Sequence, residues 1–320
     1  MRFSVIMPLY NKAPYVAKAI NSVLSQAFTD YELVIMDDGS SDNSYAVASE
    51  SIDGQAHCHI HRQPNAGASM ARNNAVALSR GDYLCFLDAD DWWAPSFLEE
   101  MSRLIDGYPD AGIYGTNYTI VNETRHKTRT APIGVDDGFE RGYINYCQVF
   151  ARTLAMPLWT GATCLSRLVF DEFGGFRPQI KIGEDFDLWI KVALKYKVAF
   201  LNKPLSFYYQ DSDATWRLVS KLHDPKANML WNLGYLDQEE GVNPDYKRLI
   251  DALRTNGLLP YYLTRKYRAV AKQELEKVDW EKQPKSVRKM YCQPVWYLIV
   301  KQRLRRTGSA VKQRLLRLFA

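Results

Sequence analysis

Cysteine is scarce in this 320-residue sequence, and the five cysteines lie far apart, with no Cys-x-x-Cys pair and no histidine at zinc-ligand spacing. An odd, scattered set argues against a disulfide framework and against a structural zinc site. No apolar run approaches the ~18 residues that cross a bilayer, and the segment before Pro8 lacks a small-residue cleavage site. We therefore expect a protein of the reduced cytoplasm, without a signal peptide.

Two common nucleotide-binding motifs are also absent. No Gly-x-Gly-x-x-Gly follows the first apolar run, and no Walker lysine loop occurs anywhere. These absences disfavour dinucleotide oxidoreductases and P-loop NTPases. What is present is an ordinary globular composition, 47% hydrophobic and 24% charged, which excludes collagen-like and wholly disordered classes.

Acidic residues are missing from the end of the chain. From residue 282 to 320 there are eleven Lys and Arg and no Asp or Glu, whereas residues 1–281 hold 30 basic and 36 acidic side chains. A helix over residues 300–319 would place six apolar side chains on one face: Val300, Leu304, Val311, Leu315, Leu318 and Phe319. Such a basic amphipathic helix suits an anionic membrane surface, here the cytoplasmic face of the inner membrane. The alternative is a helix packed on its own domain, and nucleic acid is disfavoured because no recognised module accompanies the charge.

Short apolar runs alternate with helical periods over the first ninety residues. This alternation predicts a mostly parallel, doubly wound α/β sheet flanked by helices. The predicted strands cover residues 3–7, 33–36, 58–61 and 83–87, and the predicted helices cover residues 14–26 and 69–79. Further along, residues 186–194 predict an apolar helix.

Beyond residue 216 the sequence turns helical. The candidate helices cover residues 222–236, 246–256 and 261–278. We therefore expect two regions, a catalytic sheet domain over residues 1–215 and a helical C-terminal region over residues 216–320.

Polar side chains cluster where the predicted strands end. They are Tyr10 and Asn11 after the first strand, Asp37 and Asp38 after the second, and Asp88 and Asp90 after the fourth. Ligands bind at the carboxyl ends of parallel strands, so these clusters are expected to converge on one edge of the sheet.

Three of these polar positions, and Arg72 in the predicted helix over residues 69–79, suggest specific chemistry, and each has an ordinary structural alternative. Asp88 and Asp90 supply the hard oxygen ligands that Mg²⁺ or Mn²⁺ prefers, but solvated acids also cap helices. Asp38 could accept a hydrogen bond from an imide such as that of uracil, or it could serve turn and cap chemistry alone. Arg72 could bind a phosphate, or form a surface ion pair.

A second acidic pair, Glu184 and Asp185, precedes the apolar helix at residues 186–194. One of them could act as a general base, or both could simply favour the helix N-terminus. Among the tryptophans, Trp189 is assigned to the core, and Trp159 is a candidate acceptor contact whose alternative is also core packing.

Taken together, the sequence resembles glycosyltransferase family 2, the inverting enzymes of GT-A fold, over roughly residues 3 to 215. Six segments in the family's order carry the resemblance: Val5 to Asn11, Ser22 to Gln26, Val34 to Asp42, Asn65 to Gly67 with Ala71 to Asn73, Gly81 to Asp91, and Gly174 to Phe176 before Gly183-Glu184-Asp185.

The resemblance implies roles for the site residues. Pro8, Tyr10 and Asp38 would surround the nucleotide base, with Arg72 nearby. Asp88-Ala89-Asp90 would be the DxD element, in which Asp90 binds Mn²⁺ or Mg²⁺ and Asp88 binds the ribose or the metal shell. Asp185 would be the catalytic base, and Glu184 would help to place the acceptor. In inverting transfer, the cation stabilises the departing diphosphate while a carboxylate deprotonates the acceptor.

Two features of the sequence depart from parts of the family. Gln210 stands where many relatives have a histidine that contacts the metal or phosphate, so that contact is in question. The QxxRW signature of processive synthases is absent. We therefore expect the addition of one sugar per encounter.

The predicted function is transfer of a sugar from a nucleotide-diphosphate donor, with UDP favoured, to a hydroxyl of a cell-surface glycan such as a lipopolysaccharide or of its lipid-linked precursor. One alternative is a non-catalytic protein that binds nucleotide sugars or serves as a membrane adaptor. Another is a sugar nucleotidyltransferase, which is disfavoured because its glycine-rich N-terminal phosphate loop is missing.

Overall fold

A computed structural model describes residues 1–210 and 222–301. The chain forms two compact units, residues 1–238 and 239–320, and each is described by itself. The expected domain boundary after residue 215 lies outside the described residues.

One ten-stranded sheet organises the first unit, with strand order β3-β2-β1-β4-β9-β6-β10-β5; β7 pairs with β6, and β8 pairs with β10. The strands are β1 (Phe3–Leu9), β2 (Tyr31–Asp37), β3 (Cys58–Arg62), β4 (Tyr83–Phe86), β5 (Trp92–Trp93), β6 (Ala111–Asn122), β7 (Lys127–Thr130), β8 (Arg141–Ile144), β9 (Thr163–Ser166) and β10 (Lys197–Tyr209).

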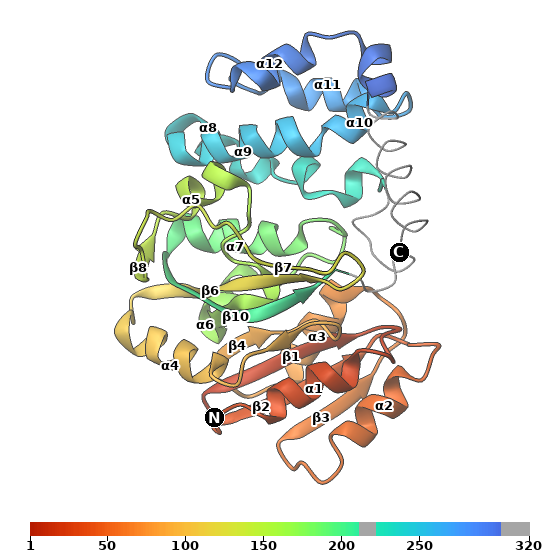
Figure 1. Cartoon of the computed structure of the whole chain (residues 1–320), viewed down its shortest axis with the longest axis vertical. Helices are drawn as coiled ribbons and strands as arrows, with labels where there is room; N and C mark the ends of the chain where they lie inside the picture. The colour runs from red at the N-terminus through yellow and green to blue at the C-terminus, as the bar shows by residue number, and fades with distance from the viewer. Residues whose placement is uncertain (211–221, 302–320) are drawn as a thin grey trace. The chain divides into compact units, whose positions relative to one another are not determined.

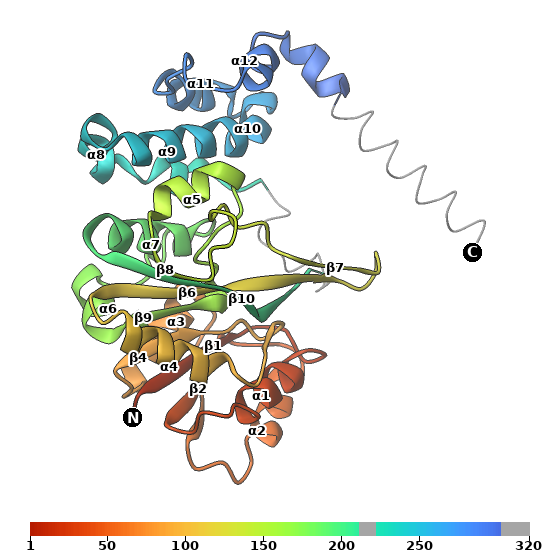
Figure 2. The same ribbon diagram turned by 60° about the vertical axis from the view of Figure 1, so that its left-hand side comes forward.

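The first four predicted strands pair as expected. β3, β2, β1 and β4 are all parallel, so their carboxyl ends share one edge. β9 then runs antiparallel between β4 and β6, and the long strands β6 and β10 run parallel to each other (Figure 2). The predicted α/β architecture is confirmed, with antiparallel strands added beyond the parallel part.

Helices cover both faces of this sheet (Figure 1). They are α1 (Val16–Leu24), α2 (Ser44–Ser51), α3 (Ala68–Leu78), α4 (Phe97–Gly107), α5 (Tyr146–Thr153), α6 (Arg167–Phe173) and α7 (Glu184–Lys195), with a 3₁₀ turn η1 (Thr160–Ala162). Apolar residues at helical spacing give α1 its buried face.

Alternate side chains of β1 separate two apolar layers. Phe3, Val5 and Met7 belong to one core together with buried residues of α1 and α4. The intervening side chains of β1 point to the opposite face, where α3 packs against β1 and β2.

The predicted core position of Trp189 is confirmed. Its side chain is fully buried, and its ring contacts Phe86 and Phe176.

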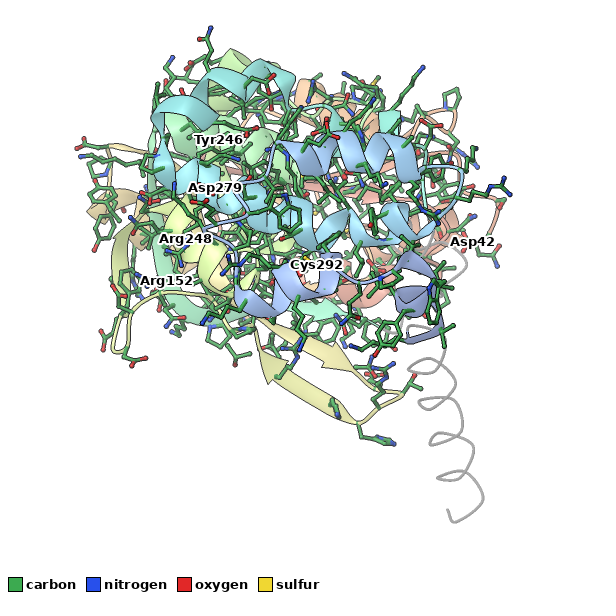
Figure 3. All side chains as sticks on the ribbon, turned by 90° about the horizontal axis from the view of Figure 1, so that it is seen from above. Asp42, Arg152, Tyr246, Arg248, Asp279 and Cys292 are labelled. Atoms are coloured by element: carbon green, nitrogen blue, oxygen red, sulfur yellow. The ribbon has the colours of Figure 1, made fainter. Side chains whose placement is uncertain are left out.

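The second unit is helical, as predicted for the C-terminal region. After α8 (Asp237–Val242), which spans the boundary, it contains α9 (Pro244–Gly257), α10 (Leu259–Leu263), α11 (Arg268–Glu276) and α12 (Lys285–Tyr291). Asn243 caps α9 by accepting a hydrogen bond from the backbone of Tyr246. Figure 3 labels Tyr246 in α9, Asp279 between α11 and α12, and Cys292 directly after α12.

Two predicted helices are wrong. Residues 222–236 form three separate 3₁₀ turns, η3 (Pro225–Ala227), η4 (Met229–Trp231) and η5 (Gly234–Leu236). Asp224 and Asn228 each accept a hydrogen bond from the backbone two residues ahead, and such local bonds compete with a continuous helix. Residues 261–278 are likewise interrupted between α10 and α11.

The amphipathic tail helix was predicted over residues 300–319. Only residues 300 and 301 of this range are described, and the rest lies outside the described residues. Within residues 1–210 and 222–301, no helix is long and apolar enough to cross a membrane.

Candidate active site

The loops after β1 and β2 are fastened to each other at the carboxyl edge of the sheet. Asn11, in a left-handed conformation with φ of 50°, accepts a hydrogen bond from the Ser41 backbone at 2.9 Å. Its own backbone N–H donates to Ser40 Oγ at 3.0 Å. Pro8 lies in β1 opposite Met36 of β2, so the predicted nucleotide-side residues do share one edge.

Asp38 holds the start of α3. One of its oxygens accepts from Gln63 Nε2 at 2.7 Å and from the Ala66 backbone at 2.8 Å, and the other accepts from the Gly67 backbone at 2.8 Å. These bonds use three of about four acceptor positions on a carboxylate. Asp38 therefore has the turn and cap role that was its structural alternative. Contact of Asp38 or Tyr10 with a nucleotide base stays a prediction.

Arg72 joins the two acidic segments that the sequence singled out. It projects from α3, is almost fully buried, and donates to Asp88 Oδ1 at 2.8 Å and to Glu184 Oε1 at 3.1 Å. Burial alone would lower the pKa of Arg72, but the charges of Asp88 and Glu184 outweigh it and raise the pKa. The guanidinium is thus the shared counter-ion of carboxylates 96 residues apart in sequence.

Glu184 and Asp185 begin α7, whose N-cap Gly183 has a φ of 78°. Burial, and then the charge of Asp185, raise the pKa of Glu184 to about 7, against the opposing effect of Arg72. The nearby Asp187 is different in kind, because it is fully buried and bound by Arg177 and Tyr235, which anchors the start of the helix. For Glu184 and Asp185, a place in the first turn of the helix is therefore compatible with the role of a general base.

The Asp185 carboxylate is held at both oxygens. Oδ2 accepts from the Thr160 hydroxyl at 2.8 Å, and Oδ1 accepts from the backbone of Phe186 at 2.8 Å. Thr160 lies in η1, far from Asp185 in sequence, so the fold itself brings them together.

Asp90, the second carboxylate of the predicted DxD element, pairs with a cation of its own. Lys12 Nζ lies 2.6 Å from Asp90 Oδ2, and both side chains are mostly buried. β4 ends at Phe86, and the backbone N–H of Asp91 donates to the carbonyl of Asp88 at 3.0 Å. Asp88 and Asp90 therefore stand in a turn, where the alternation of a strand does not apply, and they face different partners.

Asp91 completes the cluster. It is buried and accepts a hydrogen bond from the Tyr209 backbone at 2.7 Å. Burial, followed by the charges of Asp90 and Asp88, raises its pKa well above the ordinary value. Both burial and the neighbouring acids therefore favour the protonated form of Asp91.

This donor set fits a divalent cation in its chemistry. Mg²⁺ and Mn²⁺ take carboxylate oxygens, and a cation would reduce the repulsion among Asp88, Asp90 and Asp91, which adds to burial in raising the pKa of Asp91. In the part of the chain that the structure describes, no three His, Cys, Asp or Glu side chains are already arranged as a metal site. A cation there would share Asp90 with Lys12 or displace it.

Sequence reasoning missed Lys12, Thr160 and Asp91. Lys12 follows Tyr10 and Asn11 at the carboxyl end of β1, so the rule that located those residues was sufficient to find it. Thr160 gave no signal, because its partner Asp185 is close only in the folded chain.

The chain is similar in sequence to several known proteins. A family model described as Glycosyl transferase family 2 matches residues 4–173. The glycosyltransferase GlyA of Streptococcus pneumoniae serotype 4 is 29% identical over 274 residues, covering 80% of this chain and 38% of its own length. The putative colanic acid biosynthesis glycosyl transferase WcaA of Escherichia coli K12 is 25% identical over 201 residues, covering 60% and 66%. The chain thus spans between 38% and 66% of these relatives.

Solved structures share the fold. TarS of S. aureus, residues 1–349 in complex with UDP-GlcNAc, matches with a TM-score of 0.71 at 20% identity, covering 90% of this chain and 83% of that one. The mannosyltransferase PcManGT of Pyrobaculum calidifontis, in complex with GDP-Man and Mn²⁺, matches with a TM-score of 0.50 at 18% identity, covering 88% of each chain. The expected GT-A fold is therefore confirmed.

Proposed function

The chain belongs to glycosyl transferase family 2, and we propose that it transfers a sugar from a nucleotide-diphosphate donor to a hydroxyl group of a glycan or a lipid-linked glycan precursor. We propose UDP as the nucleotide, inversion at the anomeric carbon, and one sugar per encounter. TarS was solved with UDP-GlcNAc, which supports a UDP-sugar. WcaA is named for colanic acid biosynthesis, which supports a cell-surface polysaccharide as the product.

One observation carries the proposal: buried Arg72 contacts both Asp88 of the DxD element and Glu184 beside the predicted base. Transfer needs the donor's leaving group and the acceptor's hydroxyl within a few ångströms of the same carbon. A single guanidinium that binds both segments keeps the donor side and the acceptor side of the site together.

The residues then divide the work. Asp185, in the first turn of α7, would accept the proton of the attacking hydroxyl, and Glu184 would position the acceptor. Pro8, Tyr10 and Asp38 would bind the base at the edge shared by β1 and β2. Mn²⁺ or Mg²⁺, held by Asp90 and Asp88, would supply positive charge to the departing diphosphate.

A cluster of three aromatic rings, those of Trp159, Tyr118 and Tyr208, supports the binding of a sugar acceptor next to Asp185. The half-buried Trp159 ring lies 5.0 Å from the ring of Tyr118 and 4.8 Å from that of Tyr208. Burial first, and the charge of Asp185 among further causes, raise the pKa of Tyr118 to about 12. Aromatic faces bind sugar rings through their apolar side, so Trp159 is the acceptor contact that we propose.

The experiment that tests the function measures nucleotide release from UDP-, GDP- and CMP-sugars, with Mn²⁺ or EDTA, and with or without a membrane lipid extract. We expect UDP release from one donor, dependent on metal and extract, and lost ~10²- to 10⁴-fold in Asp185→Asn. Asp110→Asn, which removes an exposed carboxylate paired with Lys197, is the control and should keep full activity.

Two results would overturn the proposal. Release of pyrophosphate from UTP and a sugar 1-phosphate, with no UDP released from any nucleotide sugar, would identify a nucleotidyltransferase. Binding of a UDP-sugar without release, unchanged in Asp185→Asn, would identify a non-catalytic binding or adaptor protein.

We also propose that the basic C-terminal region attaches the protein to an anionic membrane. Trp296, Tyr297 and Val300 are exposed apolar side chains at the end of the described chain, and Lys301 follows them. Aromatic residues beside lysines suit the interface of a bilayer. In a flotation assay, vesicles with 30 mol% phosphatidylglycerol are expected to retain the full chain and phosphatidylcholine vesicles are not; equal binding to both would contradict an electrostatic attachment.

A further inference from the structure

The 3₁₀ turn η1 lies between the two acidic segments of the site. It is fixed from several sides, because the Gly161 carbonyl accepts Trp93 Nε1 and Ser206 Oγ, each at 2.7 Å. A side chain at Gly161 would meet the Trp159 ring at 2.7 Å, so the turn also packs tightly against its own neighbour. The turn therefore has little freedom to move relative to β5 and β10.

This turn is tied to the donor side of the site through sequence. Trp93 is two residues beyond Asp91, the last acid of the DxD turn. Its indole N–H reaches Gly161, the residue after Thr160. A displacement of the DxD turn would thus be transmitted to η1 through one buried hydrogen bond.

On the acceptor side, Thr160 is the contact. Only 3% of its surface is exposed, and its single hydroxyl proton is donated to Asp185 Oδ2 at 2.8 Å. Its other oxygen accepts from the adjacent backbone N–H of Phe186, which moves with α7. Thr160 is therefore the side chain that fixes Asp185 relative to the sheet.

We infer that Thr160 is a positioning residue for transfer: it aims the Asp185 carboxylate at the acceptor hydroxyl and links that aim to the DxD turn through Gly161. The inference rests on the proposed function and deepens it. The hydroxyl takes no part in bond making, since its proton stays between Thr160 and Asp185 while the other lone pairs of the carboxylate receive the acceptor's proton.

Three variants separate positioning from simple stability. Thr160→Val removes the hydroxyl at nearly equal volume, and Thr160→Ser restores it. Thr163→Val is the matched control, because the Thr163 hydroxyl is also buried and donates at 2.8 Å, but to the Trp159 carbonyl and not to Asp185. Should Thr160→Val fold poorly by circular dichroism, Thr160→Ala removes the same hydrogen bond without added bulk.

The readout is steady-state release of UDP, with Mn²⁺ and lipid extract, from whichever of UDP-GlcNAc, UDP-glucose and UDP-galactose the wild type uses. We expect kcat to fall ~10- to 100-fold in Thr160→Val, as for a misplaced catalytic group, with the donor KM unchanged. Thr160→Ser should recover most of kcat, and Thr163→Val should keep it. Equal kcat in the Thr160→Val and Thr163→Val proteins, or no recovery in Thr160→Ser, would overturn the inference.

A structural readout makes this test independent of the proposed function. Crystal structures of Thr160→Val and Thr163→Val should show the Asp185 side chain turned away in the first and native in the second. If the wild type releases no nucleotide, the proposed function fails, yet these structures still decide whether Thr160 fixes the carboxylate; an unmoved Asp185 in Thr160→Val would refute it.

Discussion

Replacing Glu184 with glutamine should change how the stability of this protein depends on pH. Burial and the charge of Asp185 raise the pKa of this carboxyl from its usual 4.5 to about 7. Glutamine keeps the shape and an oxygen that can accept the hydrogen bond from Arg72, but it cannot ionise. The variant therefore removes the titration while leaving the neighbouring contacts in place.

The sign and size follow from proton linkage. As pH rises above 4.5 the unfolded chain releases this proton first, so folding loses stability until the folded carboxyl also ionises above about pH 7. With one pKa unit worth about 1.36 kcal/mol, the loss between pH 5 and pH 8 is about 2.5 kcal/mol for this group. We therefore expect the wild type to lose about this much more stability than Glu184→Gln over this pH range.

Urea unfolding at pH 5 and pH 8, in EDTA, measures the difference. The control is Glu172→Gln, because bonds from Lys195 and Tyr196 lower the pKa of Glu172 and give no loss of stability in this pH range. A change in the pH dependence smaller than about 0.5 kcal/mol in Glu184→Gln would refute the buried, charge-coupled environment of this residue.

Three further predictions concern other parts of the chain. Arg72→Met should lower the free energy of unfolding by about 3 to 5 kcal/mol, because it leaves two carboxylates unpaired in the interior, whereas Arg103→Gln, at an exposed pair, should cost under about 1 kcal/mol; denaturant titration compares them. Native protein should show one thiol that reacts rapidly with Ellman's reagent, Cys292, because the other four cysteines are buried; a second rapid thiol would contradict that burial. Gly183→Ala should lower the melting temperature, since its φ is 78° and the added carbon would lie 2.4 Å from Met229 Cγ; an unchanged melting temperature would contradict the left-handed start of α7.

The parallel part of the fold could be predicted because its signals are local. Each of β1, β2 and β4 contains an apolar run bounded by turn residues, and α1 repeats its apolar residues every three or four positions; β3 gives a weaker signal, because histidines separate its apolar residues. The region at 222–236 misled the same reasoning, because its apolar residues have helical spacing while Asp224 and Asn228 bond the backbone locally. The periodicity of apolar residues indicates which face is buried. It does not indicate whether side chains compete for the backbone hydrogen bonds of a helix.

The site was predictable to the extent that it follows strand ends. Asp88 and Asp90 were found by this rule. That Asp88 pairs with Arg72 and Asp90 with Lys12 could not be found in this way, because it depends on a turn that starts after Phe86. The bond from Thr160 to Asp185 required the tertiary structure, because neither residue has a local pattern that points to the other.

The balance of charge at this site suggests why both cations are built into the fold. Asp88, Asp90 and Asp91 lie within one turn, and repulsion of this kind would destabilise the chain if nothing opposed it. Lys12 and Arg72 oppose it from two different loops, and Arg72 extends the same neutralisation to Glu184. Lys12 and Arg72 form ion pairs with Asp90 and Asp88; under the proposed function, a divalent cation that arrives with the donor would add further positive charge at this turn. Stability without donor and affinity for donor then depend on the same carboxylates, so removal of Asp90 should weaken the binding of metal and also lower the stability of the folded chain, because it leaves the mostly buried Lys12 without its partner.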